Sequence, residues 1–152
     1  MDEVTIRKAV REDCTPMMEL IKELAEYEKA LHEVTLTLEQ FTEDGFGNAP
    51  VWGAFVAETA GEIVGISLFY DRYSTWKGRR LYLEDLVVTE EMRGKQIGKK
   101  LFEATTDYGK SNNYSGMVFQ VLNWNEPAIN FYKKYSPKFD DEWLNVSIEF
   151  KV

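Results

Sequence analysis

The stretch RGKQIGKK, from Arg93 to Lys100, places glycine and basic residues after a strand-like run and at the start of a helical pattern. Backbone N–H groups at a helix start carry partial positive charge, and glycines let a ligand come close to the backbone. These features are typical of a phosphate or pyrophosphate site. An ordinary loop with a solvated lysine face fits the same residues, and the loop alone does not separate the two interpretations.

Two common nucleotide motifs do not match this loop. A P-loop requires G-x-x-x-x-G-K-[ST], but three residues separate Gly94 from Gly98, and Lys100 stands where the magnesium-binding hydroxyl belongs. The dinucleotide pattern G-x-G-x-x-G is also absent. The spacing therefore argues against a nucleoside triphosphate or a dinucleotide as the ligand.

Two adjacent carboxylates, Glu84 and Asp85, interrupt the apolar run LYLEDLVV that precedes the loop. In a regular strand they point to opposite faces of the sheet unless a bulge intervenes. A pair of surface acids at the edge of a strand is the plainest explanation. A site that binds or deprotonates a cationic group is the functional alternative.

Composition bounds the remaining possibilities. The 152 residues fit one domain, 1–152, and the net charge of −8 argues against nucleic acid and suits a small cationic substrate. No apolar run approaches the roughly 20 residues of a membrane span, and no secretory pattern opens the chain, so we expect a cytoplasmic protein. One cysteine, Cys14, excludes an internal disulfide. The lone His32 has no partners at metal-ligand spacing, so we expect no metal.

The elements that must position these residues follow from periodicity and caps. Thr15 and Pro16 predict the start of a helix that runs to about Lys29, and Thr37 with Gln40 predicts a capping box for a short second helix. A third helix begins within or just after the basic loop, and a fourth runs from Asn125 to about Tyr135. Predicted strands cover residues 4–8, 51–58, 63–70, 81–88, 116–122 and 143–150.

This order is β-α-α-β-β-β-α-β-α-β. Some strands are joined by hairpins and others by helices, which predicts a mixed sheet. The expected fold class is therefore α+β, with helices on both faces of one central sheet.

The loop and several other segments resemble a known family. The pattern Arg/Gln-x-x-Gly-x-Gly/Ala after a strand, which falls here on Arg93, Gln96 and Gly98, resembles the acetyl-CoA loop of the GNAT superfamily of acetyltransferases. Within it, the chain resembles the spermidine/spermine (diamine) acetyltransferases through LIKELAEYE, LTLEQFTEDGFG, LYLED, IGKKL and WNEPAINFYKK. The resemblance implies the GNAT fold, acetyl-CoA as co-substrate without a metal, a small cationic amine as substrate, and a homodimer.

The resemblance also assigns positions to the cofactor. The pantetheine arm pairs with the backbone after the two acids, the pyrophosphate meets the basic loop, and the start of the fourth helix lines the cofactor. These positions are Leu86, Val87, Val88, Arg93, Gly94, Lys95, Gln96, Ile97, Gly98, Lys99, Asn125, Glu126, Pro127 and Ala128. The chain departs from the family pattern at Gln96, which replaces a glycine and fits if its backbone is helical with the side chain turned away. It departs again after FYKK, where Tyr135, Ser136 and Pro137 follow in place of a glycine.

Acetyl transfer to an amine requires a neutral amine, and an alkyl amine with a pKa near 10.4 is deprotonated at pH 7 at a cost of roughly 4 to 5 kcal/mol. By resemblance Glu84 contacts this amine or assists its deprotonation, directly or through water, and Asp85 binds a distal cation. By the same resemblance Tyr132 donates a proton to the leaving thiolate; a core-facing aromatic is the structural alternative. Further substrate contacts by resemblance are Tyr27, Glu28, Trp76 and Asp141.

Three functions remain after this comparison. The first is an acetyl-CoA-dependent N-acetyltransferase that acts on a polyamine, a diamine or a thialysine-like amino acid. The second is a non-catalytic CoA-binding or interaction module, favoured by Gln96. The third is an acetyltransferase for protein N-termini or lysines, which the loop does not exclude.

Overall fold

The computed structural model describes residues 3–150, and the chain divides into two compact units, Met1–Phe119 and Gln120–Val152. The first unit contains a five-stranded sheet in which β1 to β4 pair antiparallel in chain order and β5 pairs parallel to β4. The mixed sheet is therefore confirmed. Its strands are β1 (Thr5–Lys8), β2 (Gly53–Thr59), β3 (Glu62–Ser74), β4 (Gly78–Val88) and β5 (Met117–Val118).

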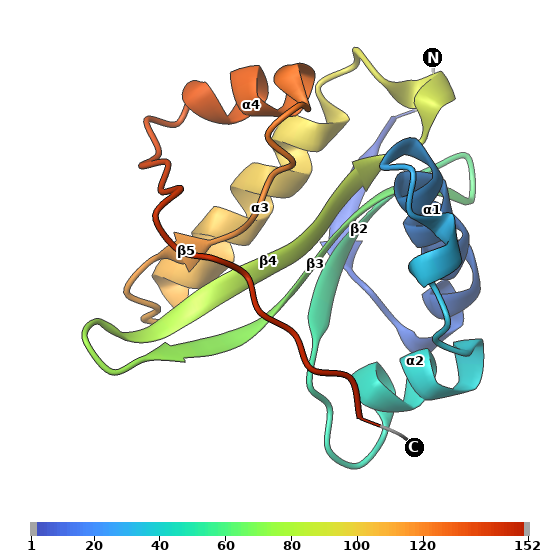
Figure 1. The fold of residues 1–152 in the computed structure, drawn as a ribbon. Coiled ribbons are helices and arrows are strands. Elements are labelled where there is room, and N and C mark those ends of the chain that lie inside the picture. The colour runs from blue at the N-terminus through green and yellow to red at the C-terminus, as the bar shows by residue number, and fades with distance from the viewer. Residues whose placement is uncertain (1–2, 151–152) are drawn as a thin grey trace. The chain divides into compact units, whose positions relative to one another are not determined.

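Helices cover both faces of this sheet (Figure 1). On one face, residues of α1 (Cys14–Tyr27) and α2 (Leu38–Phe46) share a buried cluster with Val56, Ile66 and Leu68. On the other, α3 (Ile97–Ser111) buries Leu101 against Ala57. Short 3-10 helices η1 (Arg11–Asp13), η2 (Leu31–Glu33) and η3 (Glu90–Met92) connect these elements. We refer to the two sides as the α1 face and the α3 face.

The start of α2 confirms one predicted cap, and the start of α1 corrects another. Thr37 Oγ1 accepts from the Gln40 N–H at 3.1 Å, while the Gln40 side chain bonds forward to Asp44 instead of closing the capping box. The prediction that Thr15 caps the first helix is wrong, because the turn η1 leads directly into α1 at Cys14. Asp13 stabilises this turn, since its carboxylate accepts hydrogen bonds from the Val10 N–H and from Arg7, both at 2.8 Å.

The second unit contains α4 (Glu126–Lys133), whose predicted cap is confirmed: Asn125 Oδ1 accepts from the Ala128 N–H at 3.3 Å. Two strand predictions need correction. The strand expected over 116–122 is only the two residues of β5, and the strand expected over 143–150 does not form. A strand requires a partner for its backbone groups, and within residues 3–150 no strand pairs with the apolar alternation from Trp143 to Phe150.

None of the helices within 3–150 combines the length and apolarity needed to cross a membrane. Within the same residues, no cluster of three or more His, Cys, Asp or Glu side chains has the arrangement of a metal site.

Candidate functional site

A β-bulge at Glu84 decides where the two adjacent acids point. Leu68 on β3 pairs with Asp85, but the next residue, Phe69, pairs with Leu83, so Glu84 is the extra residue of β4. A bulge of this kind breaks the strict alternation of faces. Asp85 shares the α1 face with its partner Leu68, which belongs to the buried cluster under α1. Glu84 is bonded to Tyr70, which lies two residues beyond Leu68 on β3 and on the same face. Both carboxylates therefore lie on the α1 face.

The charges of two other carboxylates, Glu84 and Glu28, act on Asp85. Glu28 directly follows α1. Burial, reinforced by Glu84 and then Glu28, raises the pKa of Asp85 to about 7. Burial also raises the pKa of Glu28. Like charges gathered in a poorly hydrated place resist ionisation together, so a cationic ligand that compensates them would bind favourably here.

Tyr70 holds the Glu84 carboxylate, and Tyr82 packs on Tyr70. The Tyr70 hydroxyl donates to Glu84 Oε1 at 2.9 Å, and the Tyr70 ring stacks on Tyr82 with centroids 5.1 Å apart. Burial and the bond to Glu84 raise the pKa of the Tyr70 phenol, which keeps it protonated as a donor. Sequence reasoning missed both tyrosines. The period of a strand places Tyr70 on the same face as Leu68, and the pairing of Tyr70 with Tyr82 places Tyr82 there too. That pairing can be recognised only once the register of β3 against β4 is known.

Beyond the bulge, no strand within residues 3–150 pairs with the edge of β4 next to β5. In this part of the chain, pairing with β5 involves Leu81 and Tyr82. Further along, the Thr89 N–H donates to Val64 O on β3 at 2.9 Å. Backbone groups alternate in direction along a strand, so those of Val87 also face β3 and those of Leu86 and Val88 face the open edge. A ligand that pairs like an added strand would meet Leu86 and Val88, whereas the Val87 side chain packs in the core under α1.

The basic loop presents a row of backbone donors. Between residues 3 and 150, no protein acceptor takes a hydrogen bond from the N–H groups of Gly94 to Lys99, and the first bond into α3 runs from Lys100 N–H to Gln96 O at 3.1 Å. The first N–H groups of a helix lack intrahelical partners and attract anions. A Cβ added to Gly98 would meet only Val88, at 3.8 Å, so this position is open in the protein alone. The loop can therefore accept a phosphate group against its backbone.

The conformation of Gln96 differs from the one expected. Its φ of 66° and ψ of 14° are left-handed, not right-handed helical, and it occupies the N-cap of α3. Arg93, three residues before Gln96, folds back toward β4. Its Nε donates to Val88 O at 3.1 Å, and its guanidinium lies 3.7 Å from a Glu23 oxygen. Part of the expected positive charge is thus already neutralised, and Lys95 and Lys99 remain as exposed cations of the loop.

Replacing Gln96 by glycine should raise the free energy of unfolding by about 0.5–1 kcal/mol, because a left-handed conformation strains a residue with a Cβ. CoA affinity should be kept or increased. Thermal melts and calorimetric titration of CoA measure the two effects. Gly94→Ala is the matched control with the opposite sign, since Gly94 has a φ of 79° and no neighbour within 4 Å of an added Cβ. A clear loss of CoA binding in the Gln96→Gly variant would contradict the pyrophosphate role of this loop.

The remaining predicted site residues lie in three places. Tyr27 ends α1, and the Arg93 guanidinium lies 5.7 Å from its ring centroid. Trp76, 85% exposed, sits in the β3–β4 turn, roughly 20 Å along the strand from Glu84. Tyr132, Asp141 and the start of α4 at Asn125 belong to the second unit. There Tyr132 is buried and packs on Phe131 at 5.3 Å, Asn125 is buried, and Asp141 is exposed. The site roles assigned to all of these residues stay predictions.

Comparison with known proteins adds a family to this geometry. Residues 14–136 match the model of the Acetyltransferase (GNAT) family. The chain belongs to this family. It is 41% identical to thialysine N-epsilon-acetyltransferase of Bos taurus over 138 residues, which cover 86% of this chain and 81% of the bovine protein. It is also 35% identical to spermidine/spermine N(1)-acetyltransferase-like protein 1 of Homo sapiens over 139 residues, which are 87% of this chain and 20% of that protein.

Solved structures agree with the fold of this GNAT chain. An aminoglycoside acetyltransferase from an uncultured soil metagenomic sample superposes with a TM-score of 0.78 at 20% identity and covers 97% of each chain. An aminoglycoside N-acetyltransferase in complex with CoA gives 0.78 at 15% identity, over 99% of this chain and 97% of the other. The family match and the relatives make this chain an acetyl-CoA-dependent N-acetyltransferase with the α+β GNAT fold, as expected from its sequence.

Proposed function

We propose that this GNAT enzyme transfers acetyl from acetyl-CoA to the terminal primary amine of a small cationic substrate, a thialysine-like amino acid or a polyamine. The bulge at Glu84 is the observation that carries the proposal. It brings Glu84 and Asp85 to one face, next to Glu28 and beside the open edge at Leu86 and Val88. The site thus places charges that attract an ammonium group beside backbone groups that can align an acyl donor.

Acetyl-CoA, when bound, supplies the thioester from which the acetyl group is taken. The unpaired N–H groups from Gly94 to Lys99, with the exposed ammonium groups of Lys95 and Lys99, hold the pyrophosphate. The backbone of Leu86 and Val88 pairs with the pantetheine arm. An N–H at this edge donates to the thioester oxygen as it gains negative charge, which is the electrostatic stabilisation used in acyl transfer. By the family resemblance, the start of α4 from Asn125 to Ala128 is a further proposed contact of the cofactor, with Asn125 buried and Glu126 and Pro127 exposed.

The carboxylates prepare the amine. An ammonium group binds between Glu84 and Asp85, and one carboxylate or a water held by it accepts the proton before the amine attacks. Asp85 suits this step because its pKa, raised to about 7 by burial and by its acidic neighbours, lies near neutral pH. Glu84 presents its second oxygen to the substrate, since Tyr70 occupies Oε1. Tyr132 then donates a proton to the leaving thiolate. Tyr27, Trp76 and Asp141 are further proposed contacts of the substrate.

The decisive experiment follows free-thiol release from acetyl-CoA with a panel of amines. The panel contains thialysine, lysine, putrescine, spermidine, spermine and a lysine-containing peptide. We expect release with thialysine or a polyamine and none with the peptide. No release with any small amine, alongside tight CoA binding, would overturn the proposal, and release with the peptide alone would select a protein acetyltransferase.

The resemblance also motivates two proposals about the assembled protein. We propose a homodimer, which analytical ultracentrifugation tests directly, and a cytoplasmic location, which fractionation of the source cells tests.

A further inference from the structure

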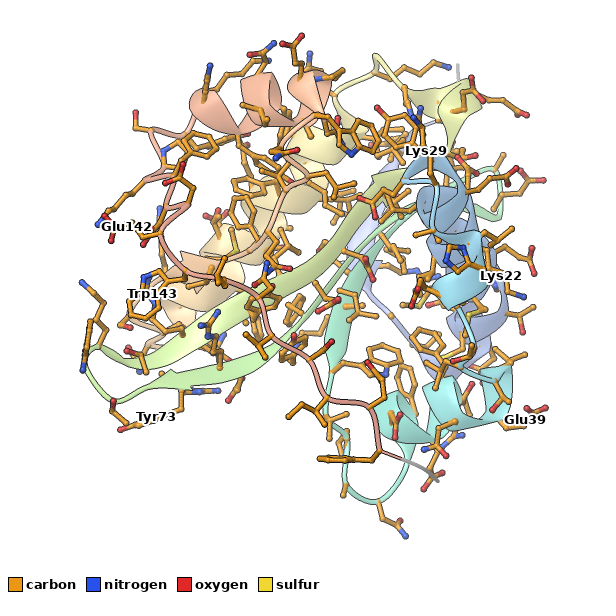
Figure 2. The ribbon with its side chains drawn as sticks, in the orientation of Figure 1. Lys22, Lys29, Glu39, Tyr73, Glu142 and Trp143 are labelled. Carbon is orange, nitrogen blue, oxygen red and sulfur yellow. The ribbon has the colours of Figure 1, made fainter. Side chains whose placement is uncertain are left out.

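An arginine pair extends the α1 face of the β3–β4 hairpin beyond the carboxylates. Arg72 on β3 pairs directly with Arg80 on β4, so the two side chains leave the same face with Cβ atoms roughly 5 Å apart. Arg72 is two residues from Tyr70, and the period of a strand places both on the α1 face. Figure 1 shows the outer end of the hairpin extending away from α1 and α2, and Tyr73, next to Arg72, is labelled near that end in Figure 2.

A continuous row of contacts joins this pair to the proposed amine site. The Arg72 guanidinium lies 5.6 Å from the Tyr82 ring centroid, Tyr82 stacks on Tyr70, and Tyr70 bonds to Glu84. The Arg72 charge also opposes the rise in the pKa of Tyr70, whose dominant cause is burial. Arg72 and Tyr70 are about 7 Å apart along the strand. Anionic and cationic groups therefore lie along one face at a separation that suits a short bifunctional molecule.

Within residues 3–150, the charge of the pair lacks an acidic partner. Among the residues that the structure describes, no carboxylate lies within ion-pair distance of Arg72 or Arg80. Like charges directly opposite each other on a sheet are destabilising. Arg79 offers the contrast: it lies on the α3 face, bonds to Asp71 at 2.9 Å and covers the Tyr114 ring at 4.0 Å. An anion that bridges or approaches Arg72 would relieve the repulsion between Arg72 and Arg80. It would have no such role at Arg79, which is already paired with Asp71.

We infer that Arg72, supported by Arg80, binds the carboxylate of the amine substrate. It thereby selects amino acids with a terminal side-chain amine over polyamines. The inference rests on the proposed function, because it takes the acetylated amine to lie at Glu84 and Asp85. The substrate's side chain then crosses the Tyr70–Tyr82 stack, with its carboxylate at Arg72. A polyamine in the same position places a second ammonium near the Arg72 guanidinium, and like-charge contact lowers its affinity.

The test uses two substrates that differ only in the carboxylate. Thialysine is compared with bis(2-aminoethyl) sulfide, its decarboxylated counterpart, by kcat/KM from thiol release. Wild-type enzyme should prefer thialysine by about 10- to 100-fold, the range expected for a charge-assisted hydrogen bond. Arg72→Gln should remove this preference through a higher KM for thialysine, leaving the diamine unchanged or improved. Arg79→Gln, the matched control on the α3 face, should retain the preference.

The outcomes separate the two proposals. If neither amine releases thiol, the proposed function fails and the inference fails with it. If both amines react and wild-type enzyme shows no preference, or Arg72→Gln weakens both amines equally, only the role of Arg72 is overturned. Calorimetric titration of thialysine into the CoA complex gives a second readout, in which Arg72→Gln should weaken binding by the same factor as it raises KM.

Discussion

Replacing Tyr132 by phenylalanine should lower kcat by about 10²- to 10⁴-fold, the usual contribution of a general acid. The phenol is proposed to protonate the departing thiolate, and phenylalanine keeps the ring but removes the proton. A free tyrosine with a pKa near 10 donates uphill to a thiolate whose conjugate acid has a pKa near 8.5, at roughly 2 kcal/mol. Donation should therefore be concerted with cleavage of the carbon–sulfur bond. Steady-state kinetics and CoA titration measure the effect.

The control for this variant is Tyr135→Phe, one turn further along and just beyond α4. Both tyrosines contact Phe131, with centroids at 5.3 Å for Tyr132 and 5.7 Å for Tyr135, so each variant removes one hydroxyl from a ring that packs on Phe131. Tyr135→Phe should leave kcat near wild type, and neither variant should change CoA affinity. Retention of full turnover in Tyr132→Phe would instead assign Tyr132 to packing alone.

Replacing Asp85 by asparagine should raise the free energy of unfolding at pH 8 by about 2–4 kcal/mol. Partial access of solvent to Asp85 favours the lower end of this range. The pKa of Asp85 is raised from 3.8 to about 7 by burial, and then by Glu84 and Glu28. Between these values the folded protein binds more protons than the unfolded chain, so stability falls as pH rises from about 4 to 7. Below pH 4 the carboxyl is protonated in both states and this cost disappears. Urea melts from pH 5 to pH 8 should show that the free energy of unfolding of Asp85→Asn exceeds that of wild type by an amount that grows with pH.

Asp13→Asn is the control with the opposite sign. The hydrogen bond from Arg7 lowers the pKa of Asp13, so its contribution to stability is present above the unfolded pKa and is lost as pH falls. Removing that carboxylate breaks the 2.8 Å pair with Arg7 and should destabilise the protein at pH 8 by about 2–3 kcal/mol. If Asp85→Asn destabilised the fold at pH 8 as well, Asp85 would be a structural ion-pair partner. The stabilised variant Asp85→Asn should also lose activity, because the Asp85 carboxylate is proposed to accept the proton of the amine.

Much of the architecture was predictable from local sequence. Strand and helix order followed from periodicity, and two helix starts followed from side-chain caps at Thr37 and Asn125, which act within three residues and need no distant partner. The start of α3 just after the basic loop was predictable for the same reason, and the role of that loop as an anion site stays a prediction.

Pairing decided what the local sequence left open. Whether Glu84 and Asp85 share a face depends on one extra residue in the register of β4 against β3, and no property of LYLEDLVV alone contains that information. The alternation from Trp143 to Phe150 predicted a strand, but strand formation depends on a partner elsewhere, and the described chain supplies none. The sequence by itself thus determined the family, the order of elements as far as α4 and the inventory of acids. Only the tertiary structure brought Glu84, Asp85 and Glu28 together and aligned them with Arg72, because strand register and bulges arise from contacts between segments distant in the chain.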